Sequence, residues 1–339
     1  MLKGHQTWEF ENQPVIISTG IVGGPFEAKG PLANDFDLLH EDLWVGQDSY
    51  EKAQKVMLEE SITKAVEKAE LRNEDIHFLL TGDLINQLTP SSFASRTLAM
   101  PFLGLFGACS TSMEGMALAA MIINANGADR IVTAASSHNA ATERQFRYPT
   151  EYGSQKPPTA QWTVTASGAV VMSNIGVGPV VTSATIGKVI DMGLTDPFNM
   201  GGAMAPAAAD TLVAHFRDLG IDHDHYDLIV TGDLGKIGSP ILKKLLQQKK
   251  LNISEDTIID CGLIIYHEDQ PVQAGGSGAG CSAAVTYGHL LNRMKKGEIQ
   301  KMLIVATGAL LSPLSFQQKE SIPCIAHAVS IEAAPSQPN

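Results

Sequence analysis

The sequence has few cysteines, and their spacing excludes two common kinds of site. Only four occur in 339 residues, and no two of them form a CxxC pair: Cys109, Cys261, Cys281 and Cys324. So few cysteines in so long a chain do not make a disulfide framework, and zinc sites usually show closer pairs. We therefore expect reduced thiols, a reducing compartment and no metal site.

Long apolar runs and an excess of positive charge are also absent. The stretch from Met1 to Gln6 lacks the apolar core of a signal peptide. The most apolar region, Phe102 to Asn126, is interrupted by Ser, Thr and Glu, so it is not a candidate membrane span. The formal net charge of -12 argues against binding to nucleic acid or to an anionic bilayer. We expect a fold of cytoplasmic type.

What the chain does contain is typical of a globular protein. Hydrophobic residues make up 44% of it and charged residues 18%. A length of 339 residues predicts roughly two domains.

The most informative stretch is Gly107 to Glu114. It follows an apolar run, Phe102 to Phe106, that reads as a buried strand, and precedes Gly115 to Ala125, which reads as a buried helix. A glycine between them permits a tight turn, which would place Cys109 beside a helix N-terminus. A small cysteine there suggests an acyl-accepting nucleophile, although a cysteine that only packs in the core is an equal alternative.

A second copy of this pattern predicts an internal duplication. The tetrapeptide TGDL ends a strand at Thr81–Leu84 and again at Thr231–Leu234, and a second elbow surrounds Cys281. Each cysteine precedes the next strand by 22 residues, as counted to Ile131 and to Leu303. The alternative is that TGDL is common turn chemistry, but order and spacing favour a repeat.

The expected elements alternate between strand and helix, which predicts parallel sheets covered by helices. We expect strands at 15–18, 76–81, 102–106, 130–135, 163–173, 226–231 and 302–306. Helices are expected from a cap at Asp48 to Ala69, from Ser91 or Ser92 to Ala99, over 115–125, from Ser239–Pro240 to Gln248, and over 284–294; residues 136–158 are expected to form a loop.

With its two elbows and two halves, the chain resembles the thiolase and ketoacyl synthase superfamily. The resemblance implies an α/β, thiolase-like five-layer αβαβα fold built from two pseudo-symmetric βαβαβαββ halves, residues 1–175 with the Cys109 elbow and 176–332. Residues 333–339 are expected to be a disordered tail. Longer stretches resemble a family of sporulation proteins within this superfamily: GACSTSME, SSHN with FRYPTEYG, TDPFNMG, YDLIVTGDLG, AGGSGAGCSA and VATGALLSP.

The departures from the enzyme pattern are not conservative. Condensing enzymes of the superfamily pair the cysteine with a histidine and with a second histidine or an asparagine. The chain has Asp233 at the first of these positions and Gly280 at the second. An aspartate anion opposes a developing oxyanion, and glycine has no side chain to donate a hydrogen bond. Cys324 to His327 only loosely resembles the second cysteine loop of thiolases. We interpret the chain as a former enzyme scaffold retained for binding.

The sporulation resemblance implies a ligand, partners and a location. The ligand is dipicolinic acid, alone or with calcium as its chelate, taken up into the developing spore. The partners are membrane proteins of the same operon, and the location is the periphery of the spore inner membrane. No cofactor is expected.

Several polar residues are candidates for binding the ligand's carboxylates. The predicted ligand-binding residues are Cys109, Ser110, Thr111, His138, Asn139, Asp233, Gly280 and His327, with Arg144 or Arg147 as possible ion-pair partners and Asp83 or Asp233 as calcium ligands. For each of them a purely structural role is the alternative.

Two other functions and the oligomeric state complete the predictions. One alternative function is an enzyme that transfers acyl groups through Cys109. The other is a structural adaptor that docks on a membrane channel with its pocket empty. The uncharged strand at Phe102–Phe106 predicts a homodimer formed by pairing of edge strands, unless the loops from Gly20 to Pro31 cover it.

Overall fold

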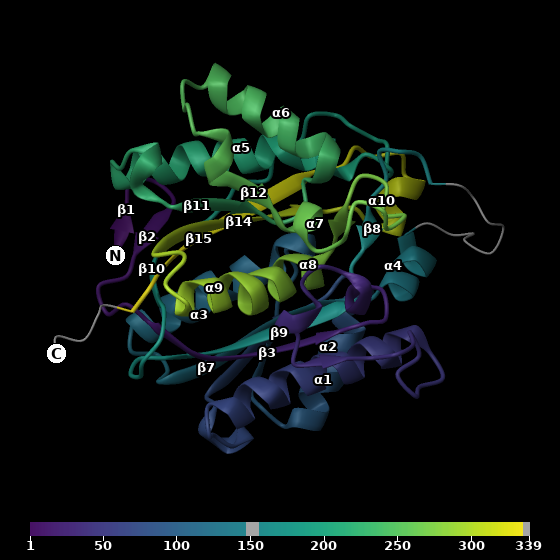
Figure 1. Cartoon of the computed structure of the whole chain (residues 1–339), viewed down its shortest axis with the longest axis vertical. Helices are drawn as coiled ribbons and strands as arrows, with labels where there is room; N and C mark the ends of the chain where they lie inside the picture. Colours follow the sequence, from purple (N-terminus) through teal and green to yellow (C-terminus); the bar gives the residue numbers. More distant parts are fainter. Residues whose placement is uncertain (147–155, 335–339) are drawn as a thin grey trace.

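The computed structural model describes residues 1–146 and 156–334, and in it ten principal strands form two layers with the same internal order (Figure 1). The first layer runs β6-β5-β7-β9-β3 and the second runs β12-β11-β14-β15-β10. Their bounds are β3 Val15–Gly23, β5 Phe78–Gly82, β6 Phe102–Gly104, β7 Arg130–Ser137 and β9 Ala166–Ser173, then β10 Val180–Thr185, β11 Leu228–Thr231, β12 Ile258–Asp260, β14 Lys301–Ala309 and β15 Cys324–Glu332.

Strand direction repeats along with strand order. In the first layer β5 pairs in parallel with β6 and with β7. In the second layer β11 pairs in parallel with β12 and with β14. The remaining pairs, β7–β9, β9–β3, β14–β15 and β15–β10, are antiparallel. The layers join where β10 pairs with β3, and the boundary expected at residue 175 lies between β9 and β10.

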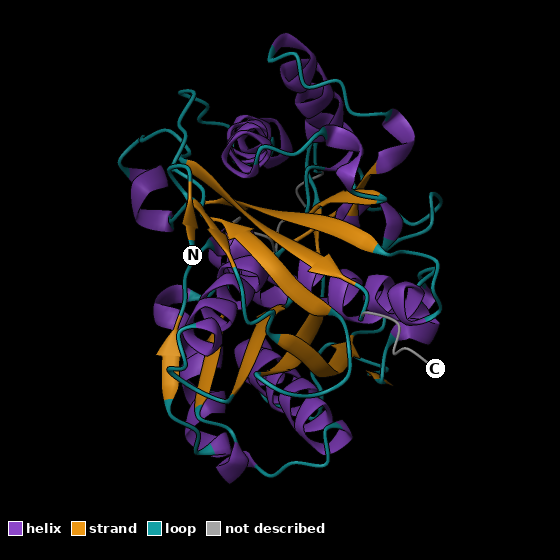
Figure 2. Ribbon diagram, turned by 90° about the vertical axis from the view of Figure 1, so that its left-hand side faces the viewer, coloured by secondary structure: helices purple, strands orange, loops and turns teal. Residues whose placement is uncertain are grey.

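Helices lie above, between and below the two sheets, which completes five layers (Figures 1 and 2). The outer layers are α1 (Tyr50–Lys68) with α2 (Thr89–Leu98), and α5 (Met200–Leu219) with α6 (Gly235–Gln248). The middle layer holds α3 (Thr111–Asn124), α8 (Ala279–Ala284), a π-helical segment (Val285–Leu290) and α9 (Leu291–Lys295). The five-layer fold predicted from the sequence is therefore confirmed.

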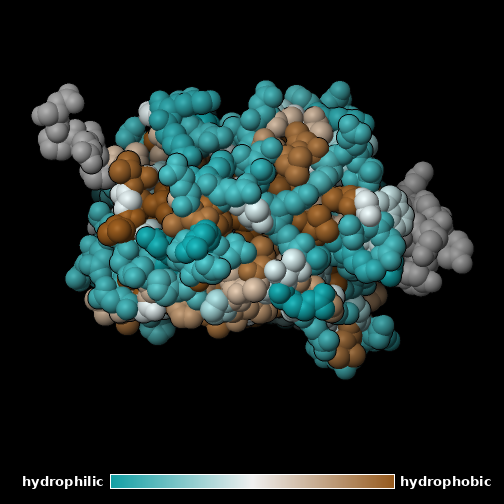
Figure 3. Space-filling model, turned by 90° about the horizontal axis from the view of Figure 1, so that it is seen from below, coloured by the Kyte–Doolittle hydropathy of each residue, from teal (hydrophilic) through white to brown (hydrophobic). Residues whose placement is uncertain are grey.

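Short elements connect these layers. They are β1 Leu2–Lys3, β2 Thr7–Glu9, β4 Leu38–Leu39, α4 Asn139–Phe146, β8 Trp162–Thr163, α7 Cys261–Ile264, β13 Gly276–Ser277 and α10 Pro313–Gln317. None of the helices in the described part of the chain is both long and apolar enough to cross a membrane. Seen from below, the layer of α1 and α2 presents a mostly hydrophilic face with apolar patches (Figure 3).

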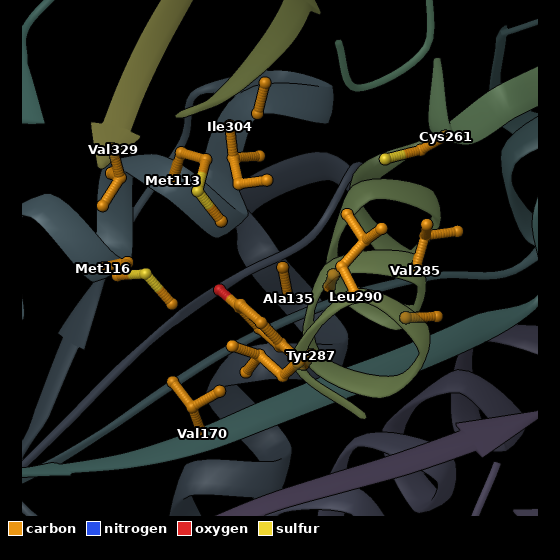
Figure 4. Packing of buried hydrophobic residues seen from close by; sticks show 14 of the residues in the cluster. Met113, Met116, Ala135, Val170, Cys261, Val285, Tyr287, Leu290, Ile304 and Val329 are labelled. Carbon is orange, nitrogen blue, oxygen red and sulfur yellow. The ribbon is translucent and has the colours of Figure 1, made fainter. Parts of the chain in front are cut away.

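The middle layer is the core that both halves share. Figure 4 shows Tyr287 of the π-helical segment pointing toward Met113 and Met116 of α3, all three fully buried. The Tyr287 hydroxyl donates to the Ser112 carbonyl at 2.9 Å, and the hydroxyl oxygens of Ser112 and Ser282 lie 2.7 Å apart. Each half therefore completes the hydrogen bonding of the other at the centre of the molecule.

Two helix starts differ from the prediction. Ser49, not Asp48, caps α1, because its side chain accepts from the Lys52 amide while Asp48 forms an ion pair with the Lys52 ammonium. Helix α6 begins at Gly235 rather than after Ser239, so its proline lies inside the helix. The cause is Asp260, whose carboxylate accepts from the amides of Leu234 and Gly235 at 2.8 and 3.1 Å.

Two further expectations are wrong near the Cys109 elbow. The expected loop over residues 136–158 contains helix α4, whose Ala, Glu, Arg and Gln residues favour a helix. The strand β6 covers only Phe102–Gly104 and is not buried, since Leu103 keeps 48% of its surface exposed; its place at the sheet edge agrees with the predicted edge strand. Arg147 and residues 335–339 lie outside the described residues.

Helix α8 lies against β9 at a distance that only glycines allow. A Cβ built on Gly280 would lie 2.2 Å from the Ala166 carbonyl oxygen, and one on Gly168 would lie 2.8 Å from the carbonyl carbon of Ala283. Backbone atoms cannot move aside as a flexible side chain can, so both contacts require glycine.

We predict that Gly280→Ala lowers the free energy of unfolding by about 1–3 kcal/mol, the usual cost of overpacking a core. Urea denaturation measures this change. The matched control is Gly127→Ala, on an exposed turn where the nearest atom is a side-chain methyl at 3.1 Å. Equal stability of the two variants would contradict the close packing of α8 on β9.

Candidate functional site

The Cys109 elbow is a tight turn between β6 and α3. Residues Ala108–Ser110 form one 3-10 turn directly before α3 begins at Thr111. The strained position is Ala108, with φ +51°, whereas Gly107 has an ordinary φ of -106°. A Cβ at Gly107 would lie 2.7 Å from both the Glu114 carboxylate and the Ser110 hydroxyl, so a larger residue would displace these side chains.

Ser110 and Thr111 hold this turn together. Ser110 donates its hydroxyl proton to the Gly107 carbonyl at 2.6 Å, and Thr111 donates to the Ala108 carbonyl at 2.7 Å. The Thr111 oxygen also accepts from the Gly107 amide at 3.1 Å. Both side chains are fully buried and bonded within the elbow, so the structure places them as supports for Cys109.

Cys109 lines a small cavity of about 40 Å³, which has room for about three water molecules. Apolar side chains form most of the wall, and three hydroxyl groups interrupt it. The lining residues are Leu84, Phe106, Ala108, Cys109, Thr142, Phe146, Thr163, Met200, Ser277, Gly278, Ala309 and Leu311. The Thr142 hydroxyl is buried and has no hydrogen-bond partner among the described residues.

Asp233 is the polar partner of Cys109, although it does not line the cavity. Its carboxylate accepts from the Thr307 hydroxyl at 2.7 Å and from the Gly278 amide at 3.0 Å. Complete burial raises the pKa of Asp233 to about 7, and hydrogen bonds from Gly278, Thr307 and the Cys109 thiol partly oppose that rise. Asp233 therefore exists near neutrality as a mixture of acid and anion.

Gly280 leaves no room for a catalytic side chain. The Ala166 carbonyl lies where its Cβ would be, and the Gly280 amide donates to the Ser137 hydroxyl at 3.0 Å. A histidine or asparagine at this position would require α8 to move away from β9.

The two residues predicted from the SSHN stretch are buried beside the cavity but do not line it. His138 hydrogen-bonds through Nε2 to the Leu43 carbonyl at 2.8 Å, and burial lowers its pKa. Asn139 begins α4 and donates from its side chain to the Thr163 carbonyl at 3.2 Å. Their contacts are those of structural residues.

His327 lies in a different cavity from Cys109. It lines a larger space together with Glu114 of α3 and Trp8 of β2. Burial lowers the pKa of His327 to about 4, so the ring is neutral. The structure thus separates a residue that the sequence analysis had grouped with Cys109.

The remaining predicted partners also lie outside the cavity. Arg144 is exposed and lies 3.9 Å from Glu51. Asp83 is buried and accepts from the Ile85 amide and from the amide and hydroxyl of Ser91. Within residues 1–146 and 156–334, no group of three or more His, Cys, Asp or Glu residues could hold a metal ion.

The sequence analysis missed the residues that form most of the cavity wall. Thr142 and Phe146 lie four residues apart on α4, so both reach the cavity from one helix face. A helix predicted over residues 139–146 would have placed the side chains of Thr142 and Phe146 on the same face. Met200 begins α5, and Ser277 lies in β13, two elements that no local signal had placed beside Cys109.

Solved structures share this fold. OleA from Xanthomonas campestris bound with cerulenin matches with a TM-score of 0.60 and 14% identity, over 96% of this chain and 97% of that one. The 3-oxoacyl-[acyl-carrier-protein] synthase III of Aquifex aeolicus VF5 matches with a TM-score of 0.56 and 13% identity, over 94% and 99%. Identities this low show a shared fold and nothing more.

Two comparisons of sequence are far more specific. The family model for stage V sporulation protein AD matches residues 4–332. Stage V sporulation protein AD of Bacillus subtilis (strain 168) is 51% identical over 333 residues, which cover 98% of each chain. The chain therefore belongs to the stage V sporulation protein AD family.

Proposed function

We propose that this protein is a non-catalytic binding protein for dipicolinic acid, which it binds at the Cys109 cavity during uptake into the developing spore. The observation that carries the proposal is the set of groups around Cys109. Its thiol bonds to a buried carboxyl, and no histidine lines its cavity among the described residues. The sporulation family gives the biological setting.

These groups suit binding better than acyl transfer. Condensation needs donors aimed at a developing oxyanion and a base matched to neutral pH. Asp233 is held by Thr307 and Gly278, and the position of Gly280 is closed by the Ala166 carbonyl. The competing hypothesis is that Asp233, with its pKa near 7, accepts the Cys109 proton and activates an acyl-accepting thiolate.

Hydroxyl groups supply the hydrogen bonds that a ligand carboxylate requires. The Thr142 hydroxyl lacks a partner within residues 1–146 and 156–334, and Thr163 and Ser277 share the same cavity. The apolar wall, with Phe106 and Phe146, suits the faces of a pyridine ring. A space of about 40 Å³ is smaller than dipicolinate, so binding requires the wall to open.

The free acid is favoured over the calcium chelate at this cavity. Hard cations prefer carboxylate oxygens as ligands. Neither Asp83 nor Asp233 lines the cavity, and both carboxylates accept hydrogen bonds from the fold itself.

Titration calorimetry with dipicolinate, run beside a thiolysis assay with acetoacetyl-coenzyme A, tests the proposal. We expect heat of binding for dipicolinate without turnover, and no need for calcium. Isophthalate, which lacks the ring nitrogen of dipicolinate, is the matched control ligand. Turnover would instead establish the acyl-transferring enzyme, and silence in both assays would favour a structural adaptor.

Variants of Cys109 locate the site. We expect Cys109→Ala to weaken dipicolinate binding by less than about 2 kcal/mol, because only one thiol contact is lost. Cys109→Trp should abolish binding by filling the cavity while the protein still unfolds cooperatively on heating. Cys324→Ala, at a buried thiol outside the cavity, is the control. Binding retained by the tryptophan variant would place the ligand elsewhere.

We further propose that the protein associates peripherally with the spore inner membrane through membrane proteins of the stage V sporulation A operon. The family and the absence of a membrane-crossing helix in the described residues support this. We expect alkaline or high-salt washing to release the protein from spore membranes, and deletion of those partners to leave it soluble. Retention after both treatments would indicate direct anchoring in lipid.

We also propose a homodimer formed through the β6 edge. This strand pairs on one side only among the described strands, and Leu103 and Phe106 beside it are each 48% exposed. The loop after β3 does not cover this edge, since its Phe26 packs on Trp162 and Tyr266.

We expect light scattering to give twice the mass of one 36.1 kDa chain, and Leu103→Lys to reduce it to one chain. The lysine places two like charges opposite each other across the paired edges. Glu320→Lys, on an exposed turn distant in sequence, is the control for added charge. A single-chain mass for the unmodified protein at tens of micromolar would contradict the dimer.

A further inference from the structure

A second cavity, of about 450 Å³, lies at the end of the molecule where the N-terminal strands meet α3. Strands β1 and β2 lie at this end of the molecule in Figure 1, and the same end faces the viewer in Figure 2. The wall includes Leu2, Trp8, Glu114, Leu118, Ile186 and His327. Its volume falls within the range of small-molecule sites and is much larger than that of the Cys109 cavity.

Glu114 brings an unsatisfied carboxylate to this cavity. Glu114 lines the cavity, while its Oε2 atom is buried on the side of Gly107, where a Cβ would lie 2.7 Å away, and has no hydrogen-bond partner in the described part of the chain. Burial alone raises the pKa of Glu114 to about 7, because no basic group close by offsets the loss of water. Ionisation of Glu114 is costly at this position, and a cation bound in the cavity would offset that cost.

His327 brings a hydrogen-bond donor to the same space. The Gly187 amide donates to Nδ1 at 3.3 Å, so the neutral ring carries its proton on Nε2. The described residues give that N–H no acceptor, although His327 lines the cavity. Glu114 lies on α3 and His327 on β15, so the fold, rather than a local sequence motif, brings both residues to this cavity.

The net charge of the wall is negative when Glu114 is ionised. Lys188 also lines the cavity, but its ammonium lies 3.2 Å from the Asp210 carboxylate and is compensated there. His327 is neutral because burial lowers its pKa to about 4. His5 is exposed at the rim. The apolar remainder, with Trp8 and Leu118, suits the body of an organic molecule rather than a bare ion.

We propose that this second cavity binds a small organic cation, a ligand class opposite in charge to the dianion at Cys109. A protonated amine would donate to Glu114, a neighbouring acceptor would receive the Nε2–H of His327, and an apolar or aromatic body would pack on Trp8 and Leu118. The inference is independent of the proposed function, since it uses neither Cys109 nor its cavity.

A pair of probes of the same shape and opposite charge tests this site. Benzylammonium and benzoate are titrated into the full chain and followed by calorimetry and by saturation-transfer NMR at neutral pH. We expect benzylammonium to bind and benzoate to bind at least tenfold more weakly. Benzoate binding as well as benzylammonium, or neither probe binding, would overturn the proposal.

Substitution of Glu114 identifies the group responsible. Glu114→Gln keeps the shape and removes the charge, so we expect benzylammonium affinity to fall by about ten- to a hundredfold, as for loss of a hydrogen bond to a charged group. Glu320→Gln makes the same change on the exposed surface and should bind like the parent protein. Unchanged affinity in Glu114→Gln would also overturn the proposal.

A cavity-filling variant keeps the test decisive if the Glu114 change disturbs folding. Leu118 lies one helical turn after Glu114 and faces the same space. Leu118→Trp should abolish benzylammonium binding while the protein retains a cooperative thermal transition. Binding that survives in this variant would show that the probe lies elsewhere.

Discussion

The structure depends on the burial of two mostly apolar helices, α3 and α8, between two sheets. Helix α8 lies close to the backbone of β9, and Gly168 and Gly280 permit that approach. Hydrogen bonds between Ser112 and Ser282, and from Tyr287 to Ser112, then satisfy polar groups that water cannot reach. The two halves are therefore not separate bodies in contact, because the core of each is completed by the other.

The repeated TGDL tetrapeptide shows how one duplicated turn acquired two roles. In the first half Asp83 accepts from Ser91 and from backbone amides, so its carboxylate only stabilises the following turn. In the second half Asp233 accepts from Thr307, Gly278 and the Cys109 thiol. The same residue at the same strand end is structural in one copy and belongs to the candidate site in the other.

The fold was largely predictable because its signals are local. Each TGDL turn, each cysteine elbow and the spacing to the next strand depend on a few neighbouring residues. The start of α6 was not predictable in this way, because Asp260, 26 residues after Leu234 in sequence, caps it. A cap supplied by a residue so distant in sequence can be recognised only in the folded structure.

Cys109, at the centre of the candidate site, was predicted from the sequence, whereas most residues of the cavity wall were not. Cys109 and its turn follow from Gly107 to Thr111, whereas Thr142, Met200 and Ser277 converge from three separate elements. His327 was grouped with Cys109 on a loose sequence similarity. Alternation along β15 places Ala326 and Ala328 toward α5 and His327 with Val329 toward α3, where His327 lines the larger cavity and not that of Cys109.

Helix α3 and the turn that leads into it each line one of the two cavities, and this has a mechanical consequence. Cys109 immediately precedes the helix and Glu114 lies within it, so one rigid body forms a wall of both spaces. A helix packed between two sheets shifts as a unit, since its neighbours leave it no room to bend. Opening the small cavity by moving α3 would reshape the large one, so occupancy of either cavity would displace the start of the helix that borders the other.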